Sequence, residues 1–449
     1  MPEVLELGIG ALRRAIEAGE TDPVSVARAC LERIDELAHL NAWVEVRPEA
    51  LDEAPAARGA LAGVPVAVKD VFVDGGRAPT CGSRVRATWL SGTASVVRRL
   101  REAGAIVVGY ANLHEWAIGM SSAVTATGPV VNPWDETLVP GGSSGGSAVA
   151  LAAGMVPAAV GSDAGGSIRC PSACCGVTGL KPTWDRVPTK GFAGDGGTID
   201  HVGPMARSVA DVTLLFGVMA GEEIALDEVS GLRVGIPRSF FFDDLDPELG
   251  AAVEGAIEVV RGLVAEVREV ELPSAPLASF AVPGLLLPLF ARRLDGILAR
   301  DPDMFQPPTA RLLELGSDMS EEDLIQAGHV KAEVEADWER VFAEVDVVVT
   351  PTLPGRPAAL DTLMLELPSG PASPELAYLR TNAPMNLGGV PALLLPCGEL
   401  PGGLTTNLTL TAARSRDELV LSLGEAFERA TESVYTGRIA SRTGPRSGD

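Results

Sequence analysis

Two short glycine-rich loops bring serine residues into positions where they could act as nucleophiles. Residues 141–147 read GGSSGGS and contain Ser143, and residues 161–167 read GSDAGGS and contain Ser167. Glycine allows a backbone to approach a ligand closely and to adopt dihedral angles that other residues avoid. The two loops are therefore the first place to look for chemistry in this chain.

Three interpretations of these loops remain open from the residues alone. They could be turns around a buried helix and strand, or they could hold a phosphate group. A phosphate-binding loop of the P-loop type needs a lysine after its last glycine, and none follows Gly145 or Gly146. In the third interpretation a serine attacks a substrate while backbone N–H groups of Gly165, Gly166 and Ser167 stabilise a developing oxyanion. This last interpretation is favoured.

The segment between the loops predicts how they meet. Alanine, valine and leucine dominate it, which predicts a short helix over residues 147–153 and a buried strand over residues 156–160. A helix and a strand that pack side by side return the second loop close to the first. Two serines far apart in the sequence could then share one site.

A lysine ends another stretch that reads as a buried strand. Residues 61–70, LAGVPVAVKD, form an apolar run that ends in Lys69 and Asp70. Lysine is rarely buried without a partner, so Lys69 either points to solvent, pairs with Asp70, or acts as a general base. The third role requires its pKa to fall from about 10.4 to near 8, which takes roughly 3 kcal/mol of desolvation.

A serine–histidine–aspartate site is the competing arrangement. Gly141, Ser143 and Gly145 match the G-x-S-x-G pattern of a nucleophile elbow, which needs an acid and a histidine later in the chain. His201 and His329 are the two histidines that follow, and neither lies in a glycine-framed loop. A relay of two serines and a lysine fits the residues better.

The cysteines do not indicate a metal site or a disulfide framework. Three of the six cluster at Cys170, Cys174 and Cys175, but no second cysteine pair or paired histidines accompany them. We expect small buried thiols, no metal and no cofactor.

Composition indicates a large α/β enzyme packed by small side chains. The chain has 449 residues, 50 glycines, 46% hydrophobic residues and a net charge of −24, and such a charge repels nucleic acids. Strand and helix patterns alternate, which predicts an α/β fold with a mostly parallel mixed central sheet covered by helices on both faces. We expect one domain over residues 1–440, with a helical apron at 1–60, a variable lid or substrate region at about 273–325 and a frayed tail at 441–449.

The apolar run within the lid region has two interpretations. Residues 283–290, PGLLLPLF, are followed by two arginines and could cap the site against a membrane. A helical lid or ordinary core is favoured, because the run is too short to cross a bilayer. No basic and apolar leader opens the sequence, so we expect a cytoplasmic protein without membrane contact.

Four motifs in a fixed order resemble the amidase signature family. They lie within a match that runs from about residue 61 to residue 217, with weaker similarity at 347–352 and 386–398. The motifs are residues 63–70 (GVPVAVKD), 140–147 (PGGSSGGS), 161–169 (GSDAGGSIR) and 175–183 (CGVTGLKPT).

The resemblance implies a Ser-cisSer-Lys triad. In it Ser167 is the nucleophile, Ser143 is a bridging serine on a cis peptide bond, and Lys69 is the base. The resemblance also implies an oxyanion hole formed by the N–H groups of the four residues Ala164, Gly165, Gly166 and Ser167. Hydrogen-bonding residues behind the triad would be Ser144, Asp163 and Arg169.

The substrate implied by the resemblance is a small-molecule amide. Tyr110 and residues 120–128 depart from the pattern of many relatives, so the acyl pocket is the least determined part. Trp116, Met120, Arg380 and residues 285–290 are our candidates for the pocket or its lid. The chain is expected to be a free-standing amidase, with the amidase or glutaminase subunit of a tRNA-dependent amidotransferase as the alternative. Neither direct nucleic-acid binding nor a metal is expected, and a homodimer is left open.

Overall fold

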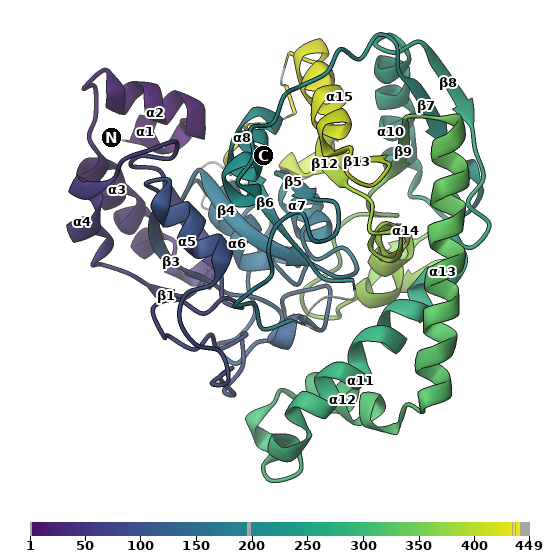
Figure 1. Ribbon diagram of the computed structural model, residues 1–449, viewed down its shortest axis with the longest axis horizontal. Coiled ribbons are helices and arrows are strands. Elements are labelled where there is room, and N and C mark those ends of the chain that lie inside the picture. Colours follow the sequence, from purple (N-terminus) through teal and green to yellow (C-terminus); the bar gives the residue numbers. More distant parts are fainter. Residues whose placement is uncertain (1, 195–198, 433, 436, 441–449) are drawn as a thin grey trace, which may run out of the picture.

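An eleven-stranded mixed sheet runs through the whole protein (Figure 1). The structure is a computed structural model that describes residues 2–194, 199–432, 434–435 and 437–440. The strands in spatial order are β1 (Trp43–Val46), β3 (Ile106–Ala111), β2 (Pro65–Lys69), β4 (Ala158–Asp163), β6 (His201–Ala206), β5 (Thr178–Lys181), β12 (Ala392–Glu399), β13 (Thr405–Ala412), β9 (Val347–Pro351), β7 (Arg233–Ile236) and β8 (Glu266–Glu269).

Parallel pairing is confined to the two flanks of this sheet. Strands β3, β2 and β4 pair in parallel on one side, and β9, β7 and β8 do so on the other. The strands between β4 and β9 pair antiparallel throughout, as does the edge strand β1. The expected mixed α/β sheet is confirmed, but it is less parallel than alternating strands and helices predicted. The difference arises because β5, β6, β12 and β13 are joined without the regular crossover helices that parallel pairing needs.

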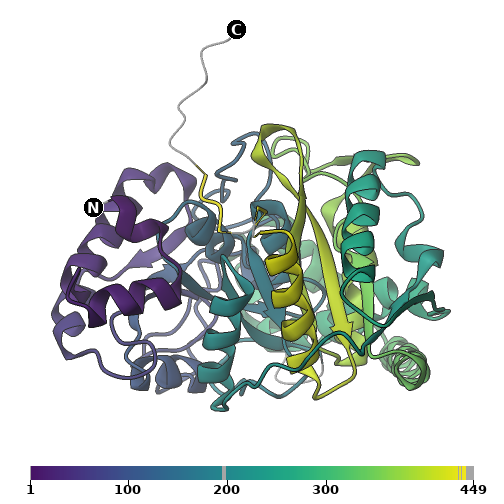
Figure 2. The ribbon, with the colours of Figure 1, turned by 90° about the horizontal axis from the view of Figure 1, so that it is seen from above.

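Helices cover both faces of the sheet (Figure 2). One face carries α3 (Pro23–Glu36), α6 (Gly145–Ala152), α7 (Arg169–Cys175) and α14 (Pro374–Gly388). The other carries α5 (Ser95–Glu102), α8 (Val209–Ala220), α10 (Pro247–Arg261) and α15 (Asp417–Ala430). Further helices are α1 (Pro2–Glu6), α2 (Ile9–Glu17), α4 (Ala50–Glu53), α9 (Arg238–Phe241), α11 (Ala278–Leu298), α12 (Pro307–Asp318) and α13 (Glu321–Glu344), and a small hairpin is formed by β10 (Leu365–Leu367) and β11 (Gly370–Ala372).

Strand β2 shows how the alternation of side chains places the lysine. All five of its residues are buried, and Val66 and Val68 pack into the core under α5 and α8. Ala67 packs into the other core, with α3 and α6. Since side chains alternate along a strand, Lys69 lies on the same face as Ala67. The end of β2 therefore delivers the amine to the face where α6 and the first glycine loop lie.

Helices α11 and α12 form a projecting unit connected to the rest of the protein by α13 (Figure 1). This unit corresponds to the lid region expected at about 273–325. The segment Ala275–Leu298 is long and apolar enough to cross a membrane by length and composition. It nevertheless packs against α12, α13 and α14, and more than half of it is buried inside the protein. The packing favours the interpretation of a helical lid or ordinary core over that of a cap against a membrane.

The first sixty residues are not purely helical, which corrects part of the apron expectation. Strand β1 lies among the helices α1 to α4 and pairs antiparallel with β3 at the edge of the sheet. With only four residues, it is too short to stand out by its pattern of polar and apolar side chains. The expected frayed tail at residues 441–449 lies outside the described part of the chain.

The start of α6 generates a stability prediction. A Cβ atom at Gly146 would lie 2.4 Å from the backbone oxygens of Ala42 and Asn112, closer than real contacts allow. We expect Gly146→Ala to lower the free energy of unfolding by about 1–3 kcal/mol, because backbone atoms must shift. Urea unfolding followed by circular dichroism measures the effect.

The control for this prediction is Gly231→Ala, where an added Cβ meets no atom within 4 Å. That variant should stay within about 0.5 kcal/mol of the parent protein. Equal unfolding midpoints for the two variants would show that the close packing at Gly146 is not required.

Candidate active site

Lys69 is fully buried and makes hydrogen bonds with two serine hydroxyls. Its Nζ lies 2.7 Å from Ser143 Oγ and 2.8 Å from Ser162 Oγ. Burial lowers the pKa of Lys69 from its ordinary value of 10.5 to about 7, against the opposing attraction of Asp200 and Asp163. A large share of the amine is therefore uncharged at neutral pH and able to accept a proton.

Ser143 lies in a loop that is held from several sides. The Gly142–Ser143 peptide bond is cis, as the family resemblance implied. The carbonyl oxygen of Ser143 accepts hydrogen bonds from the backbone N–H of His114 at 3.1 Å and from the hydroxyl of Ser122 at 3.3 Å. These bonds fix the peptide while the hydroxyl of Ser143 faces the amine of Lys69.

Ser144 connects the two glycine loops. Its backbone N–H donates to the carbonyl of Ser167 at 3.1 Å. Its hydroxyl donates to the carbonyl of Ser162 at 3.2 Å and accepts from the N–H of the same residue at 3.3 Å. The loops that carry Ser143 and Ser167 are thus adjacent, as the helix and strand between them predicted.

That helix and strand differ slightly from expectation. Helix α6 begins at Gly145, two residues earlier than predicted, and β4 begins at Ala158 and continues to Asp163. Part of the second glycine loop is therefore a strand end. The extension matters because it directs Ser162 to the amine of Lys69.

Asp163 and Arg169 form a fully buried ion pair behind Ser167. The carboxylate accepts two hydrogen bonds from the guanidinium at 3.0 and 3.1 Å and one from the side-chain amide of Asn386 at 2.8 Å. Burial raises the pKa of Asp163, but the charge and hydrogen bonds of Arg169 outweigh it and leave the pKa below its usual range. Both residues support the loop rather than face the cavity.

The same carboxylate corrects the expected oxyanion hole. The N–H of Gly166 donates to Asp163 Oδ1 at 2.7 Å, so it is not directed at a substrate. A buried carboxylate needs several donors, and Asp163 takes this one from the turn. The N–H groups of Ala164, Gly165 and Ser167 make no hydrogen bonds with the described residues, so of the four expected donors these three are not taken up by Asp163.

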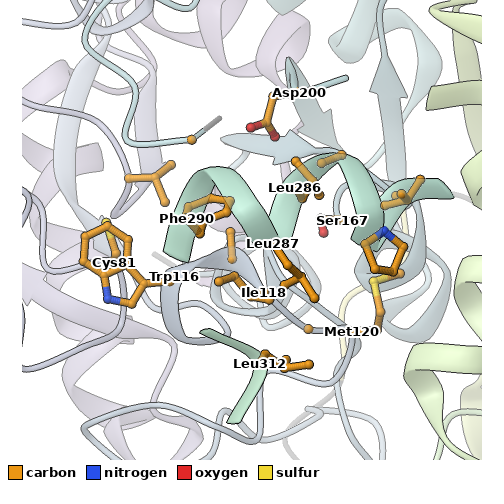
Figure 3. Close-up of a pocket in the computed structure, with 18 of the residues that line it drawn as sticks. Cys81, Trp116, Ile118, Met120, Ser167, Asp200, Leu286, Leu287, Phe290 and Leu312 are labelled. Atoms are coloured by element: carbon orange, nitrogen blue, oxygen red, sulfur yellow. The ribbon is translucent and has the colours of Figure 1, made fainter. Parts of the chain in front are cut away.

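Gly166 must be glycine for a second reason. Its φ angle is +126°, a conformation that side-chain-bearing residues rarely adopt, and a Cβ would lie 2.7 Å from Cys170 Sγ. The turn it forms presents the hydroxyl of Ser167 to a cavity, where this hydroxyl makes no hydrogen bond with the described residues (Figure 3).

The cavity next to Ser167 has a volume of about 150 Å³ and is almost entirely apolar. Its walls come from the loop after β3, from the second glycine loop and from helices α11, α12 and α14. The lining residues are Val71, Cys81, Trp116, Ala117, Ile118, Gly119, Met120, Ala164, Gly165, Ser167, Phe192, Ala193, Gly194, Asp200, Val282, Pro283, Leu286, Leu287, Phe290, Leu312, Glu375 and Leu379. Asp200 and Glu375 are the ionisable carboxyl groups among them.

Most of the expected pocket residues do line this cavity. Trp116 and Met120 are in its wall, and from the run 285–290 so are Leu286, Leu287 and Phe290. Arg380 is not, which corrects that candidate. Its guanidinium stacks over the ring of Phe240, which does not line the cavity.

Tyr110, the residue noted as a departure from the family pattern, also lies elsewhere. Its hydroxyl donates to Asp74 at 2.8 Å, and the guanidinium of Arg77 stacks on its ring. It does not line the cavity.

The histidines are not arranged as a catalytic base. His201 Nδ1 lies 3.2 Å from the carbonyl of Asp163, and burial lowers the pKa of His201 well below its ordinary value. His329 is exposed on α13. Neither contacts Ser143 or Ser167, so a Ser-His-Asp site is not formed.

Ser162 is a hydrogen-bond partner of Lys69 that the sequence did not single out. It lies directly before Asp163 in the second glycine loop, but nothing in the sequence shows that it would face Lys69. Cys81 and Leu379 in the pocket wall were also missed, because they come from segments far from the glycine loops.

Metal chemistry has no obvious donor set in the described residues, which contain no group of three or more His, Cys, Asp or Glu side chains placed to hold an ion. All six cysteines are buried free thiols. Burial raises the pKa of Cys170 and Cys175 well above the ordinary value. These cysteines pack behind the site as expected.

Comparison with known proteins assigns the family. The model of the family described as "Amidase" matches residues 25–421. The chain belongs to the amidase signature family.

Relatives within this family are similar to this chain over nearly its full length. A glutamyl-tRNA(Gln) amidotransferase subunit from Chloroflexus aurantiacus is 35% identical, over 96% of this chain and 98% of the relative. A crystal structure described as an amidase has a TM-score of 0.90 at 34% identity, covering 94% of this chain and 99% of the other. The crystal structure of a Thermotoga maritima protein, also named as a glutamyl-tRNA(Gln) amidotransferase subunit, has a TM-score of 0.79 at 28% identity, covering 95% of both chains.

The buried ion pair of this amidase generates a stability prediction. Asp163→Asn leaves the guanidinium of Arg169 buried without its counter-charge, and we expect the free energy of unfolding to fall by about 3–5 kcal/mol. Thermal and urea unfolding of the purified variant measure this.

A partly exposed ion pair provides the control. Asp346 pairs with Arg233 at 2.8 Å, and Asp346→Asn should cost less than about 1 kcal/mol. If the two variants lose equal stability, burial does not explain the importance of Asp163.

Proposed function

We propose that this protein is an amidase that hydrolyses an amide with a largely apolar acyl group through an acyl-enzyme on Ser167. The observation that carries the proposal is the hydrogen bond between the buried amine of Lys69 and the hydroxyl of Ser143, next to a cavity into which Ser167 opens. The family supplies the reaction class, and the catalytic roles of these residues are our proposal.

We propose a proton relay from Ser167 through Ser143 to Lys69, of which the structure contains the hydrogen bond between Lys69 and Ser143. The uncharged amine of Lys69 takes a proton from Ser143, which takes one from Ser167 as Ser167 Oγ attacks the carbonyl carbon. The N–H groups of Ala164, Gly165 and Ser167 stabilise the negative oxygen that forms. The proton returns through Ser143 to the departing amine, and water then hydrolyses the ester on Ser167 by the same relay.

The cavity supports an apolar acyl group. Its wall is formed mainly by aliphatic and aromatic side chains, and an enclosed apolar site favours the part of the substrate that stays bound in the acyl-enzyme. A leaving amine, by contrast, must depart after the first step. We therefore place the acyl group in the cavity.

The second candidate function is release of ammonia from glutamine for a partner protein. It is supported by relatives that are named as glutamyl-tRNA(Gln) amidotransferase subunits and are similar over nearly the whole chain. Glutamine carries a carboxylate, however, and no lysine, arginine or histidine is among the described residues that line the cavity. An unpaired charge in such a cavity is costly, so this candidate is less well supported.

Removing the proposed nucleophile tests the function. We expect Ser167→Ala, Ser143→Ala and Lys69→Ala each to lower kcat at least about a thousandfold, and the triple variant to be little slower than any single one. Rates are measured with a panel that contains acetanilide, hexanamide and glutamine. Intact-mass analysis after rapid quenching should show an acyl group that Ser167→Ala lacks.

The matched control is Ser172→Ala, because Ser172 is a buried serine on α7 whose hydroxyl has no partner among the described residues. It should retain most of the activity. A faster reaction with glutamine than with hexanamide, together with a co-purifying partner protein, would favour the amidotransferase alternative. Full activity of Ser167→Ala would exclude the proposed mechanism.

The pKa of Lys69 gives a pH prediction. Because the neutral amine is the active form and its pKa is about 7, kcat/KM should rise with pH up to about 7 and then level off. Well below pH 7 the expected slope is about tenfold per pH unit. A profile that is flat from pH 5.5 to 8.5 would contradict the assignment of Lys69 as the base.

A further inference from the structure

The cavity beside Ser167 is not neutral, although it is apolar. Asp200 and Glu375 both line it, and no basic side chain is among its described lining residues. A cavity with this charge attracts a cationic substrate group and repels an anionic one. The two carboxyl groups therefore add a preference for positively charged substrate groups to the preference of the wall for apolar ones.

Glu375 is placed where its carboxylate could select between substrates of different charge. It is partly buried in the first turn of α14, and its carboxylate makes no hydrogen bond or ion pair with the described residues. Glu115, next to the lining residue Trp116, instead accepts a hydrogen bond from the N–H of Gln306 at the start of α12.

The position of Glu375 along α14 sets its distance from the reaction. Leu379 follows it by one helical turn and reaches the backbone of Gly165, whose absent Cβ would lie 2.5 Å from a methyl group of Leu379. These four residues correspond to about 6 Å along the helix axis. Glu375 is thus separated from the oxyanion donors by an apolar stretch of the wall.

The basic residue on the same helix cannot neutralise this end of the cavity. Arg380 is directed away, and its guanidinium donates to the carbonyl of Phe240 at 2.5 Å while stacking on the ring of the same residue. The helix thus presents a carboxylate to the cavity and keeps its guanidinium outside.

We propose that Glu375 selects amides whose acyl chain ends in a positively charged group, several methylene groups from the carbonyl carbon. In such a substrate the chain contacts the apolar wall while the terminal ammonium pairs with Glu375. The proposal rests on the proposed function, since it takes the cavity beside Ser167 as the acyl pocket.

Three p-nitroanilides of equal chain length test the proposal. Their acyl groups are 6-aminohexanoyl, hexanoyl and 5-carboxypentanoyl, so they differ only in a terminal ammonium, methyl or carboxylate group. We expect kcat/KM to be highest for the ammonium substrate and lowest for the carboxylate substrate. Raising the salt concentration from about 0.05 to 0.5 M should narrow the difference, since salt screens partly exposed charges.

Substitution of Glu375 separates the charge preference that its carboxylate gives from the binding of the acyl chain by the rest of the cavity. Glu375→Gln should lower the ammonium-to-methyl ratio of kcat/KM about three- to tenfold. Glu375→Lys should reverse the preference in favour of the carboxylate substrate. The matched control is Glu339→Gln, an exposed residue on α13 outside the cavity, which should change none of the ratios.

The outcomes distinguish this proposal from the proposed function. If none of the three anilides, nor any amide of the broader panel, is hydrolysed, the proposed function fails. If the hexanoyl substrate is hydrolysed through Ser167 but Glu375→Gln leaves the ammonium-to-methyl ratio as it was, the selecting role of Glu375 is overturned while the amidase remains.

Discussion

The burial of one amine is the constraint on which the rest of the site depends. A lysine in an apolar interior is stable only when it gives up its charge or finds strong partners. Burial lowers the pKa of Lys69 to about 7, so a large share of the amine is uncharged at neutral pH, and the hydroxyls of Ser143 and Ser162 satisfy its hydrogen bonds. Those three groups come from the end of β2, from the loop before α6 and from the end of β4. The central sheet must therefore place the parallel strands β2 and β4 side by side before Lys69 can reach both hydroxyls.

A second buried charge holds the loop of Ser167, the proposed nucleophile, in place. Asp163 collects hydrogen bonds from the N–H groups of Gly166 and Ile168 and from the guanidinium of Arg169. The carboxylate thereby determines the shape of the turn that carries Ser167. It also decides which N–H groups remain for the substrate, since the one of Gly166 is already used. In the mechanism that we propose, support of the loop and stabilisation of the oxyanion compete for the same backbone donors, and the N–H of Gly166 serves the loop.

The sequence predicted the parts of the site that are local or carry a strong motif. The strand ending at Lys69, the two glycine loops and their approach through a helix and a strand could all be read from composition and spacing. Residues whose role depends on the direction of a side chain could not. Ser162 faces the amine of Lys69 only because β4 extends to Asp163. Arg380 does not line the cavity because its guanidinium packs against Phe240. The antiparallel centre of the sheet was likewise hidden, because pairing between distant strands leaves no local signal.

The residues of the proposed relay and the helices that close the cavity come from different parts of the chain. This separation explains why membership of the family does not determine the substrate. Lys69, Ser143 and Ser167 lie within residues 61–217, where the motifs are continuous, whereas α11, α12 and α14 close the cavity from the second half of the chain. A relay of three residues tolerates little displacement, because each proton transfer requires a hydrogen bond. An apolar wall tolerates exchange of one aliphatic side chain for another. Relatives can therefore share the reaction while their acyl pockets diverge, and similarity over the whole chain transfers the amide chemistry without transferring the substrate.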